Sequence, residues 1–163
     1  WVHCFTAPRA LTLRGGRVIA RPYLPGLPLA PATLEGVPTD EAGTRVVELE
    51  GSRSWRLAFD ASYEGALSVR IGSDSGLSIT LEEGRLTVDL TGTRYPHGGR
   101  RIVTLDAGEA CCVEILHDRS ITEIYLGDGS RVFTTRSFLN GAGAGVALEG
   151  GASVTDIRAV RAD

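Results

Sequence analysis

Apolar and polar residues alternate with a period of two along most of the chain between residues 44 and 163. This alternation indicates strands with one buried face, and it returns at the spacing of about 8 to 12 residues that sandwiches and barrels show. Helical spacing is almost absent. The apolar positions that mark the runs are Val47, Leu49, Trp55, Leu57, Phe59, Leu67, Val69, Ile71, Leu77, Ile79, Leu81, Leu86, Val88, Leu90, Val103, Leu105, Val146 and Leu148. We therefore predict an all-β fold of about ten strands, with two antiparallel sheets packed as a jelly-roll-like β-sandwich.

The most regular part of this pattern runs from Cys112 to Phe138, where three short apolar runs are separated by two turn sequences. The first turn sequence is Asp118-Arg119-Ser120 and the second is Gly127-Asp128-Gly129. An Asp-Gly pair between alternating runs favours a two-residue type I′ turn, because that turn needs positive φ at both central residues. The stretch is predicted to be a three-stranded meander with one buried face.

Two further segments frame the predicted sandwich domain of residues 44–163. Residues 1–22 are expected to form short strands, with a hairpin that turns at Gly15-Gly16. Residues 23–43 contain four prolines, which can neither donate to a ladder nor continue a helix. That segment is predicted to be a Pro-rich linker with one helical turn near residues 32–35. At the other end, Ile157 and Val160 break the period of two and predict a bulge or an irregular end.

Composition narrows the class of protein. The net charge is −3, and no apolar run reaches the length of a membrane helix, so we expect neither nucleic acid nor a membrane as a partner. Cys4, Cys111 and Cys112 suit neither a disulfide framework nor zinc spacing, so they are interpreted as reduced thiols, with no metal and no cofactor expected. The chain starts at Trp1 and contains no Met, and we expect it to be a piece of a longer protein.

Two segments carry a family resemblance. The residues Asp-Arg-Ser-x-x-Glu-x-Tyr-x-x-Asp-Gly, at positions 118–129, resemble the signature hairpin of the C-terminal β-sandwich of glycoside hydrolase family 32. Residues 7–18 and Pro22 resemble the family's Leu-Pro-Arg-Glu-Leu…Asp-Gly-Arg-Leu segment, with Ala10 in place of the usual Glu and Gly16 at the Asp or Asn position. The family holds invertases, sucrose-6-phosphate hydrolases, levanases and inulinases.

The resemblance implies a division of the chain. In the family, the segment that matches residues 1–22 closes the five-bladed catalytic propeller and leads into the sandwich. Residues 1–22 are therefore expected to be remnant strands of the propeller exit. Without the propeller these strands lose their usual cover, so we expect residues 1–21 to pack on a sandwich, either their own or that of a second copy.

The catalytic motifs of the family are missing from the sequence. Glycoside hydrolysis needs two carboxylates about 5 Å apart for retention, or roughly 6.5 to 9.5 Å apart for inversion. The resemblance implies a retaining mechanism with a nucleophile in a Trp-Met-Asn-Asp-Pro-Asn-like motif, an acid/base in Glu-Cys and a third acid in Arg-Asp-Pro. None of these is present, and the single Asn is Asn140. No catalytic residue is predicted, and the chain alone is not expected to hydrolyse sugar.

Other chemical motifs favour structural interpretations. Gly141–Gly145 and Gly72–Gly76 are interpreted as loops between strands, since no helix follows the first and the second has a single acid. His117 is interpreted as a hydrogen-bonded core histidine in preference to a ligand. Trp55 shares a face with Leu57 and Phe59 and is interpreted as core.

Six polar and aromatic residues are candidates for carbohydrate contact. They are Tyr95, His97, Arg101, Asp118, Arg119 and Glu123. Sugar binding combines stacking aromatics with acids and Arg. The structural interpretation remains open beside it: Asp118 and Ser120 cap their own turn, and Arg119 pairs with a neighbouring acid.

Two functions of different classes follow. The first is a non-catalytic C-terminal module of a bacterial, cytoplasmic β-fructofuranosidase that acts on sucrose, sucrose phosphate or fructans. Its expected partner is the catalytic propeller of the same parent chain, and a homodimer is a second possibility. The alternative is a fructan-binding module, with fructan as the partner.

Overall fold

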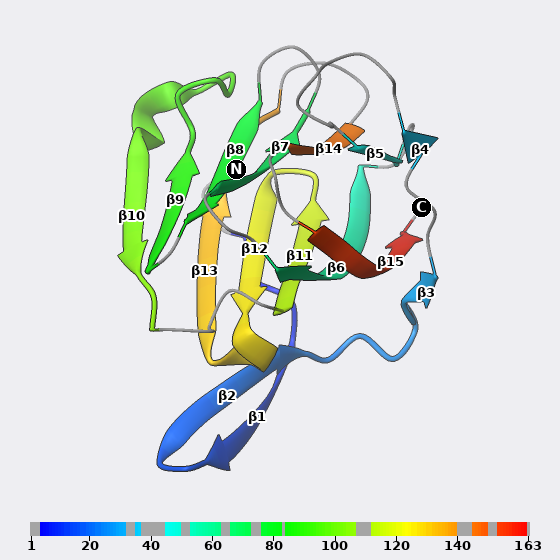
Figure 1. The fold of residues 1–163 in the computed structure, drawn as a ribbon, viewed down its shortest axis with the longest axis vertical. Helices are drawn as coiled ribbons and strands as arrows, with labels where there is room; N and C mark the ends of the chain where they lie inside the picture. The colour runs from blue at the N-terminus through cyan, green and yellow to red at the C-terminus, as the bar shows by residue number, and fades with distance from the viewer. Residues whose placement is uncertain are drawn as a thin grey trace.

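The structure is a computed structural model that describes residues 4–31, 35–36, 45–49, 53–62, 66–72, 76–82, 84–106, 112–139, 145–149 and 153–162. Within these ranges the chain is nearly all β (Figure 1). The strands are β1 (Arg9–Arg14), β2 (Arg17–Pro22), β3 (Ala30–Pro31), β4 (Glu35–Gly36), β5 (Arg45–Glu48), β6 (Ser54–Ser62), β7 (Ala66–Ile71), β8 (Leu77–Glu82), β9 (Arg85–Asp89), β10 (Arg100–Thr104), β11 (Cys112–Asp118), β12 (Ile121–Leu126), β13 (Arg131–Arg136), β14 (Gly145–Glu149) and β15 (Ser153–Arg161). Two 3₁₀ turns, η1 (Pro96–Gly98) and η2 (Gly127–Gly129), join them.

Most of the strands form two antiparallel sheets. The seven-stranded sheet has the order β10-β9-β8-β7-β14-β5-β4, and the six-stranded sheet has the order β13-β12-β11-β6-β15-β3. Their facing sides share one hydrophobic core. The two remaining strands, β1 and β2, form a separate hairpin that extends below the sheets in Figure 1. The predicted all-β sandwich with an N-terminal hairpin is confirmed.

The core consists of the predicted apolar positions of alternating strands. Leu57 and Phe59 on β6, Ile115 on β11 and Ile79 on β8 are fully buried. Burying one such side chain contributes roughly 1.5 to 3 kcal/mol. Val103 is only partly buried against the core. The side chains of residues 47, 146 and 148 lie outside the description, although β5 and β14 form where they were predicted.

The meander of β11, β12 and β13 is confirmed, but its second turn differs from the prediction. Asp118 pairs with Ile121, which leaves a two-residue turn in which Arg119 has φ +53°. Leu126 pairs with Arg131, so the second connection has four residues and contains η2. The type I′ turn predicted at Asp128-Gly129 is therefore wrong, because positive φ extends over three consecutive residues, 127–129.

Residues 9–36 supply one hairpin and two edge strands. In the hairpin, Arg14 pairs with Arg17 around Gly15 and Gly16, which have φ +56° and +76°, as the predicted tight turn requires. Within the Pro-rich segment, β3 joins the edge of one sheet beside β15, and β4 joins the edge of the other beside β5. The helical turn predicted at residues 32–35 falls on 32–34, outside the described residues, and on Glu35, which is in a strand.

The last strand of the fold, β15, contains an irregularity. β15 shifts its register against β6 between Thr155 and Arg158, so the irregularity predicted at Ile157 is confirmed. Asp156 in this bulge has φ +49°.

In the part of the chain that the structure describes, no helix is long and apolar enough to cross a bilayer.

Candidate functional site

Glu123 on β12 is a buried carboxylate that holds the N-terminal segment of the chain. Strand alternation turns Ile124 into the core and therefore places Glu123 on the outer face of the six-stranded sheet. Its Oε1 accepts the backbone N–H of Ala7 at 2.6 Å. Its Oε2 accepts hydrogen bonds from Arg9 Nη2 at 2.5 Å and from the Tyr125 hydroxyl at 2.9 Å. Both carboxylate oxygens are thus occupied by this chain.

Arg9 is the cation that pairs with the Glu123 carboxylate. Its Nε donates to the Tyr125 hydroxyl at 3.2 Å, and Nη2 also donates to Thr134 Oγ1 at 2.9 Å. Its guanidinium carbon lies 5.5 Å from the centre of the Tyr125 ring, within cation–π range. Burial opposes the charged form of Arg9, but the hydrogen bonds to Glu123 and Tyr125 outweigh it and raise its pKa. Burial, with help from the Glu123 carboxylate, also raises the pKa of Tyr125.

The Asp-Gly pair at the end of the same motif holds the hairpin β1–β2. The carboxylate of Asp128 accepts from Arg14 at 2.8 Å and from Arg21 at 3.3 Å, and its backbone carbonyl accepts from Arg21 Nε at 2.8 Å. Gly129 has φ +98°, and a Cβ there would collide with the carbonyl oxygen of Ala20 on β2. Glycine is therefore needed for the close approach of β2 as well as for the backbone conformation.

These contacts define one docking site, formed by Glu123, Tyr125, Asp128 and Gly129. All four residues belong to the motif that resembles the family signature, and all four contact the segment from Ala7 to Arg21. That segment is the second stretch of family resemblance. The two resembling stretches, about 100 residues apart in sequence, are therefore the two halves of one interface.

Sequence reasoning missed the role of Arg9. A signal was present, because Arg9 lies in one family-like segment, Glu123 lies in the other, and their charges are opposite. Period-two alternation alone could not find the pair, since a carboxylate on the outer face of a sheet ordinarily faces water. The contact depends on the N-terminal segment crossing that face.

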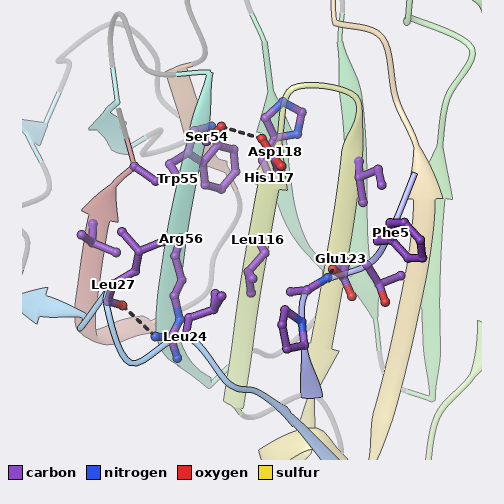
Figure 2. A pocket seen from close by; sticks show the side chains of 16 residues that line it. Phe5, Leu24, Leu27, Ser54, Trp55, Arg56, Leu116, His117, Asp118 and Glu123 are labelled. Carbon is purple, nitrogen blue, oxygen red and sulfur yellow. Dashed lines mark hydrogen bonds between the residues drawn. The ribbon is translucent and has the colours of Figure 1, made fainter. Parts of the chain in front are cut away.

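A pocket of about 400 Å³ lies between the N-terminal segment and the outer face of the six-stranded sheet. Figure 2 shows Leu24 and Leu27 on one side, Phe5 and Glu123 on the other, and Leu116 between them. The lining is mainly apolar. The Ser54 hydroxyl donates to Asp118 at 2.6 Å at one end of the pocket (Figure 2). The pocket thus offers apolar contact with one exposed carboxylate at its rim.

Arg56 is held at the opposite end of the pocket from that carboxylate. Its Nη1 donates to the backbone carbonyl of Leu27 at 3.1 Å, and it forms an ion pair with Glu114 on the adjacent strand (Figure 2 shows the first contact). Glu114 and Arg56 neutralise one another. These contacts fix the segment around Leu27 to the sheet in the same way that Glu123 fixes Ala7.

Trp55 and His117 both line the pocket and stack on each other, with ring centres 5.3 Å apart and planes at 30°. His117 is buried, and its Nδ1 lies 3.0 Å from Thr122 Oγ1, which lies 2.7 Å from the hydroxyl of Ser137. Burial lowers the pKa of His117 to about 4, against the smaller opposing effects of Asp118 and the Arg119 backbone. His117 is thus a neutral core histidine at neutral pH. Trp55 is also core, and its buried Nε1 has no hydrogen-bond partner among the described residues.

The structure divides the six predicted contact residues between two places. Asp118 and Glu123 line the pocket, and Arg119 lies in the adjoining turn. Asp118 accepts from Ser54 on β6 in place of the predicted bond to its own turn. The backbone N–H of Arg119 donates to the carbonyl of Arg53 at 2.7 Å.

The other three candidates, Tyr95, His97 and Arg101, lie in and beside the loop before β10. Tyr95 packs edge-on against Phe138 with ring centres 5.0 Å apart, and Arg101 Nε donates to the Gly98 carbonyl at 3.2 Å. His97 is exposed in η1. The pocket lining includes none of these three residues. In the part of the chain that the structure describes, no three His, Cys, Asp or Glu side chains converge as metal ligands would.

The fold resembles a part of known glycoside hydrolases. No family model matches the chain. Over 147 residues the chain is 27% identical to a sucrose-6-phosphate hydrolase of Pediococcus pentosaceus, and the match covers 86% of this chain and 29% of that protein. The solved structure of a sucrose-6-phosphate hydrolase from Lactobacillus gasseri matches 95% of this chain and 33% of its own, with TM-score 0.75 and 19% identity. A glycoside hydrolase family 32 structure from Bifidobacterium adolescentis matches 96% of this chain and 25% of its own, with TM-score 0.74 and 18% identity.

These matches agree with the two motifs. The fold matches a quarter to a third of each of these two solved structures, and the resemblance to glycoside hydrolase family 32 is confirmed. The chain spans less than a third of the length of the curated relative that it matches.

Proposed function

We propose that this chain is the non-catalytic sandwich module of a β-fructofuranosidase that acts on sucrose, sucrose phosphate or fructans. The observation that carries the proposal is the docking site, where the family-like hairpin holds the family-like N-terminal segment through Glu123 and Asp128. The names of the matched relatives support the substrate class, and the share of their length that is matched supports a module within a larger enzyme.

The physical role of the module in this proposal is to hold the segment that enters it. Glu123 and Arg9 form a charge-assisted pair, and such hydrogen bonds are roughly twice as strong as neutral ones. The pair is mostly shielded from water, so salt screens it less than it screens exposed pairs. A catalytic propeller attached through residues 4–9 would therefore be fixed to a rigid support. In this proposal the compartment is the bacterial cytoplasm, where a thiol such as that of Cys4 stays reduced.

A fructan-binding module is the alternative, and the pocket is the place where it would act. The lining of the pocket is mainly apolar, and both oxygens of Glu123 are already bonded within the chain. A sugar site would offer free hydrogen-bonding groups beside an aromatic platform. Of the aromatic rings in the pocket lining, Trp55 and His117 are buried, and Phe5 is exposed near Glu123, whose two oxygens are both bonded. These features favour the structural role over sugar binding.

Two measurements test the proposal. The full-length product of the gene that encodes this chain should hydrolyse sucrose or sucrose 6-phosphate, and this chain alone should not. Titration of the chain with levan, sucrose and fructose by calorimetry should give no saturable heat. Saturable heat with levan would establish the binding-module alternative, and hydrolysis by the chain alone would overturn the non-catalytic role.

A further inference from the structure

The pocket between the N-terminal segment and the outer face of the six-stranded sheet has room for a small organic molecule. Its volume of about 400 Å³ lies within the range of roughly 300 to 1,000 Å³ that small-molecule sites occupy. Such sites are lined mostly by apolar side chains, with a few polar groups that orient the ligand. The pocket has this composition, because Leu24, Leu27 and Leu116 form its wall, with Asp118 at one end and Arg56 at the other (Figure 2).

Two of the charged side chains in the lining are neutralised within the chain. Arg56 pairs with Glu114, and its Nη1 donates to the carbonyl of Leu27. Glu123 pairs with Arg9, and both of its carboxylate oxygens accept hydrogen bonds. An anionic ligand would therefore find no free cation among the described residues that line the pocket.

Asp118 is the charged group of the lining that remains. Its Oδ1 accepts the hydrogen bond of the Ser54 hydroxyl at 2.6 Å, which holds the carboxylate at the rim. Within the described part of the chain, Oδ2 accepts no hydrogen bond and no Arg forms an ion pair with Asp118. The adjacent His117 does not compensate the charge, because its pKa of about 4 leaves the ring neutral at pH 7. The pocket thus combines an apolar wall with one uncompensated negative charge.

We propose that the pocket binds a small organic ammonium compound, with its apolar body against Leu24, Leu27 and Leu116 and its cationic end at Asp118. The ammonium group would donate a charge-assisted hydrogen bond to Oδ2, and such bonds are stronger than neutral ones. The body would remove apolar side chains from water, which is favourable in proportion to the area covered. The inference goes beyond the proposed function and does not depend on it, because every group that it uses belongs to this chain.

The same features select against two other classes of ligand. A fatty acid offers a similar apolar body, but its carboxylate would meet the like charge of Asp118, and like-charge contacts are a common source of specificity. A fructan offers many hydroxyl groups, which would lose water against the leucines without gaining hydrogen-bond partners there. The pocket therefore fits a cation with an apolar body better than an anion or a sugar.

The test titrates this chain with three probes that share one apolar body, namely octylammonium chloride, 1-octanol and sodium octanoate. At pH 7 they are a cation, a neutral molecule and an anion, and backbone amide NMR signals locate their binding. The cation should give saturable shifts that are largest around Ser54, Leu116 and Asp118. It should bind about threefold to fivefold more tightly than 1-octanol, as an ion pair close to solvent allows. Octanoate should bind more weakly than the alcohol.

Two isosteric variants assign the preference to Asp118. Asp118→Asn removes the charge and keeps an oxygen that can accept from Ser54, so it should lower the affinity for octylammonium to that for 1-octanol and leave the alcohol unaffected. Asp156→Asn is the matched control, because it removes the same charge from an exposed carboxylate outside the pocket lining. The control should leave the affinities for all three probes unchanged.

The possible outcomes separate charge selection in the pocket from other effects. Equal affinities for the three probes, tightest binding of octanoate, or no saturable shifts at the pocket would each overturn the inference. A preference for the cation that persists in Asp118→Asn would assign it to another group and would overturn the inference as well. If Asp156→Asn loses the preference as strongly as Asp118→Asn does, the effect is one of net charge, and the inference fails.

Discussion

The sandwich core and the N-terminal hairpin use opposite means of attachment. In the core, side chains such as Phe59 and Ile79 are fully buried and contribute through the apolar area removed from water. In the hairpin, Arg14 and Arg21 bond Asp128 of the sandwich, and Leu11, Leu13 and Val18 are exposed, although Ile19 is buried. The difference indicates that buried apolar area holds the core together, whereas ion pairs contribute to holding the hairpin on the sandwich.

The largest expected effect breaks the core. Trp55→Ala should lower the free energy of unfolding by roughly 3 to 5 kcal/mol, because it leaves a cavity among buried side chains. Urea unfolding measures the loss, and Ile102→Ala, at an exposed position, should change stability by less than about 0.5 kcal/mol. A loss below about 1 kcal/mol for Trp55→Ala would contradict its place in the core.

The second prediction concerns the pH dependence of stability that His117 in the core should cause. The pKa of His117 is about 4 in the folded protein and about 6.5 in a free side chain, so the unfolded chain binds the proton more tightly. Stability should be complete above about pH 6.5 and should fall as the pH drops towards 4, by at most about 3 kcal/mol. Urea unfolding between pH 4 and 7 should show this slope, and His117→Gln should flatten it. A wild-type slope that survives the substitution would show that another group is responsible.

The third prediction loosens the hairpin and spares the core. Arg9→Ala removes the main partner of the buried Glu123 carboxylate and should lower the free energy of unfolding by about 2 kcal/mol. This loss is smaller than that for a fully buried pair, because Arg9 is partly exposed. Hydrogen exchange should accelerate in β1 and β2 and stay slow in β6 and β11. Arg100→Ala, which breaks the exposed pair with Asp89, is the control and should leave the hairpin unchanged. Uniform acceleration throughout the sandwich would mean that the two regions are one cooperative unit.

The smallest effect concerns the rim of the pocket. Asp118→Ala removes the acceptor of the Ser54 hydroxyl and should lower stability by about 1 kcal/mol or less. The double variant with Ser54→Ala should cost little more than either change alone, because both remove the same bond. Additive losses in urea unfolding would show that the two side chains act independently.

The sequence predicted the core well, for a physical reason. Period-two alternation follows directly from one buried face, and runs such as Leu77, Ile79 and Leu81 need no knowledge of distant residues. The bulge in β15 was visible for the same reason, since Ile157 breaks the period. The second turn of the meander was wrong, because an Asp-Gly pair fits both a two-residue turn and the longer connection that η2 forms.

The docking site was harder to predict. Glu123 was singled out as a sugar contact from its residue type and its place in the motif, and its partner Arg9 lies 114 residues away. The alternation of β12 shows which face Glu123 occupies and cannot show what crosses that face. The contact of Gly129 was equally hard to predict, because its close neighbour is the backbone of Ala20. Every residue has the same backbone, so the identity of residue 20 gives no indication of such a contact.

The edges of the two sheets have a consequence for self-association. An open strand edge can recruit further strands and grow into fibres. Here the six-stranded sheet ends in β3, where Pro31 has no N–H to offer, and in β13, which carries Arg131 and Arg136. The seven-stranded sheet ends in β10, with Arg100 and Arg101, and in the two-residue strand β4. The sandwich is therefore guarded against growth by strand addition, and the hairpin can keep its leucines in solvent without making the sheets themselves prone to polymerise.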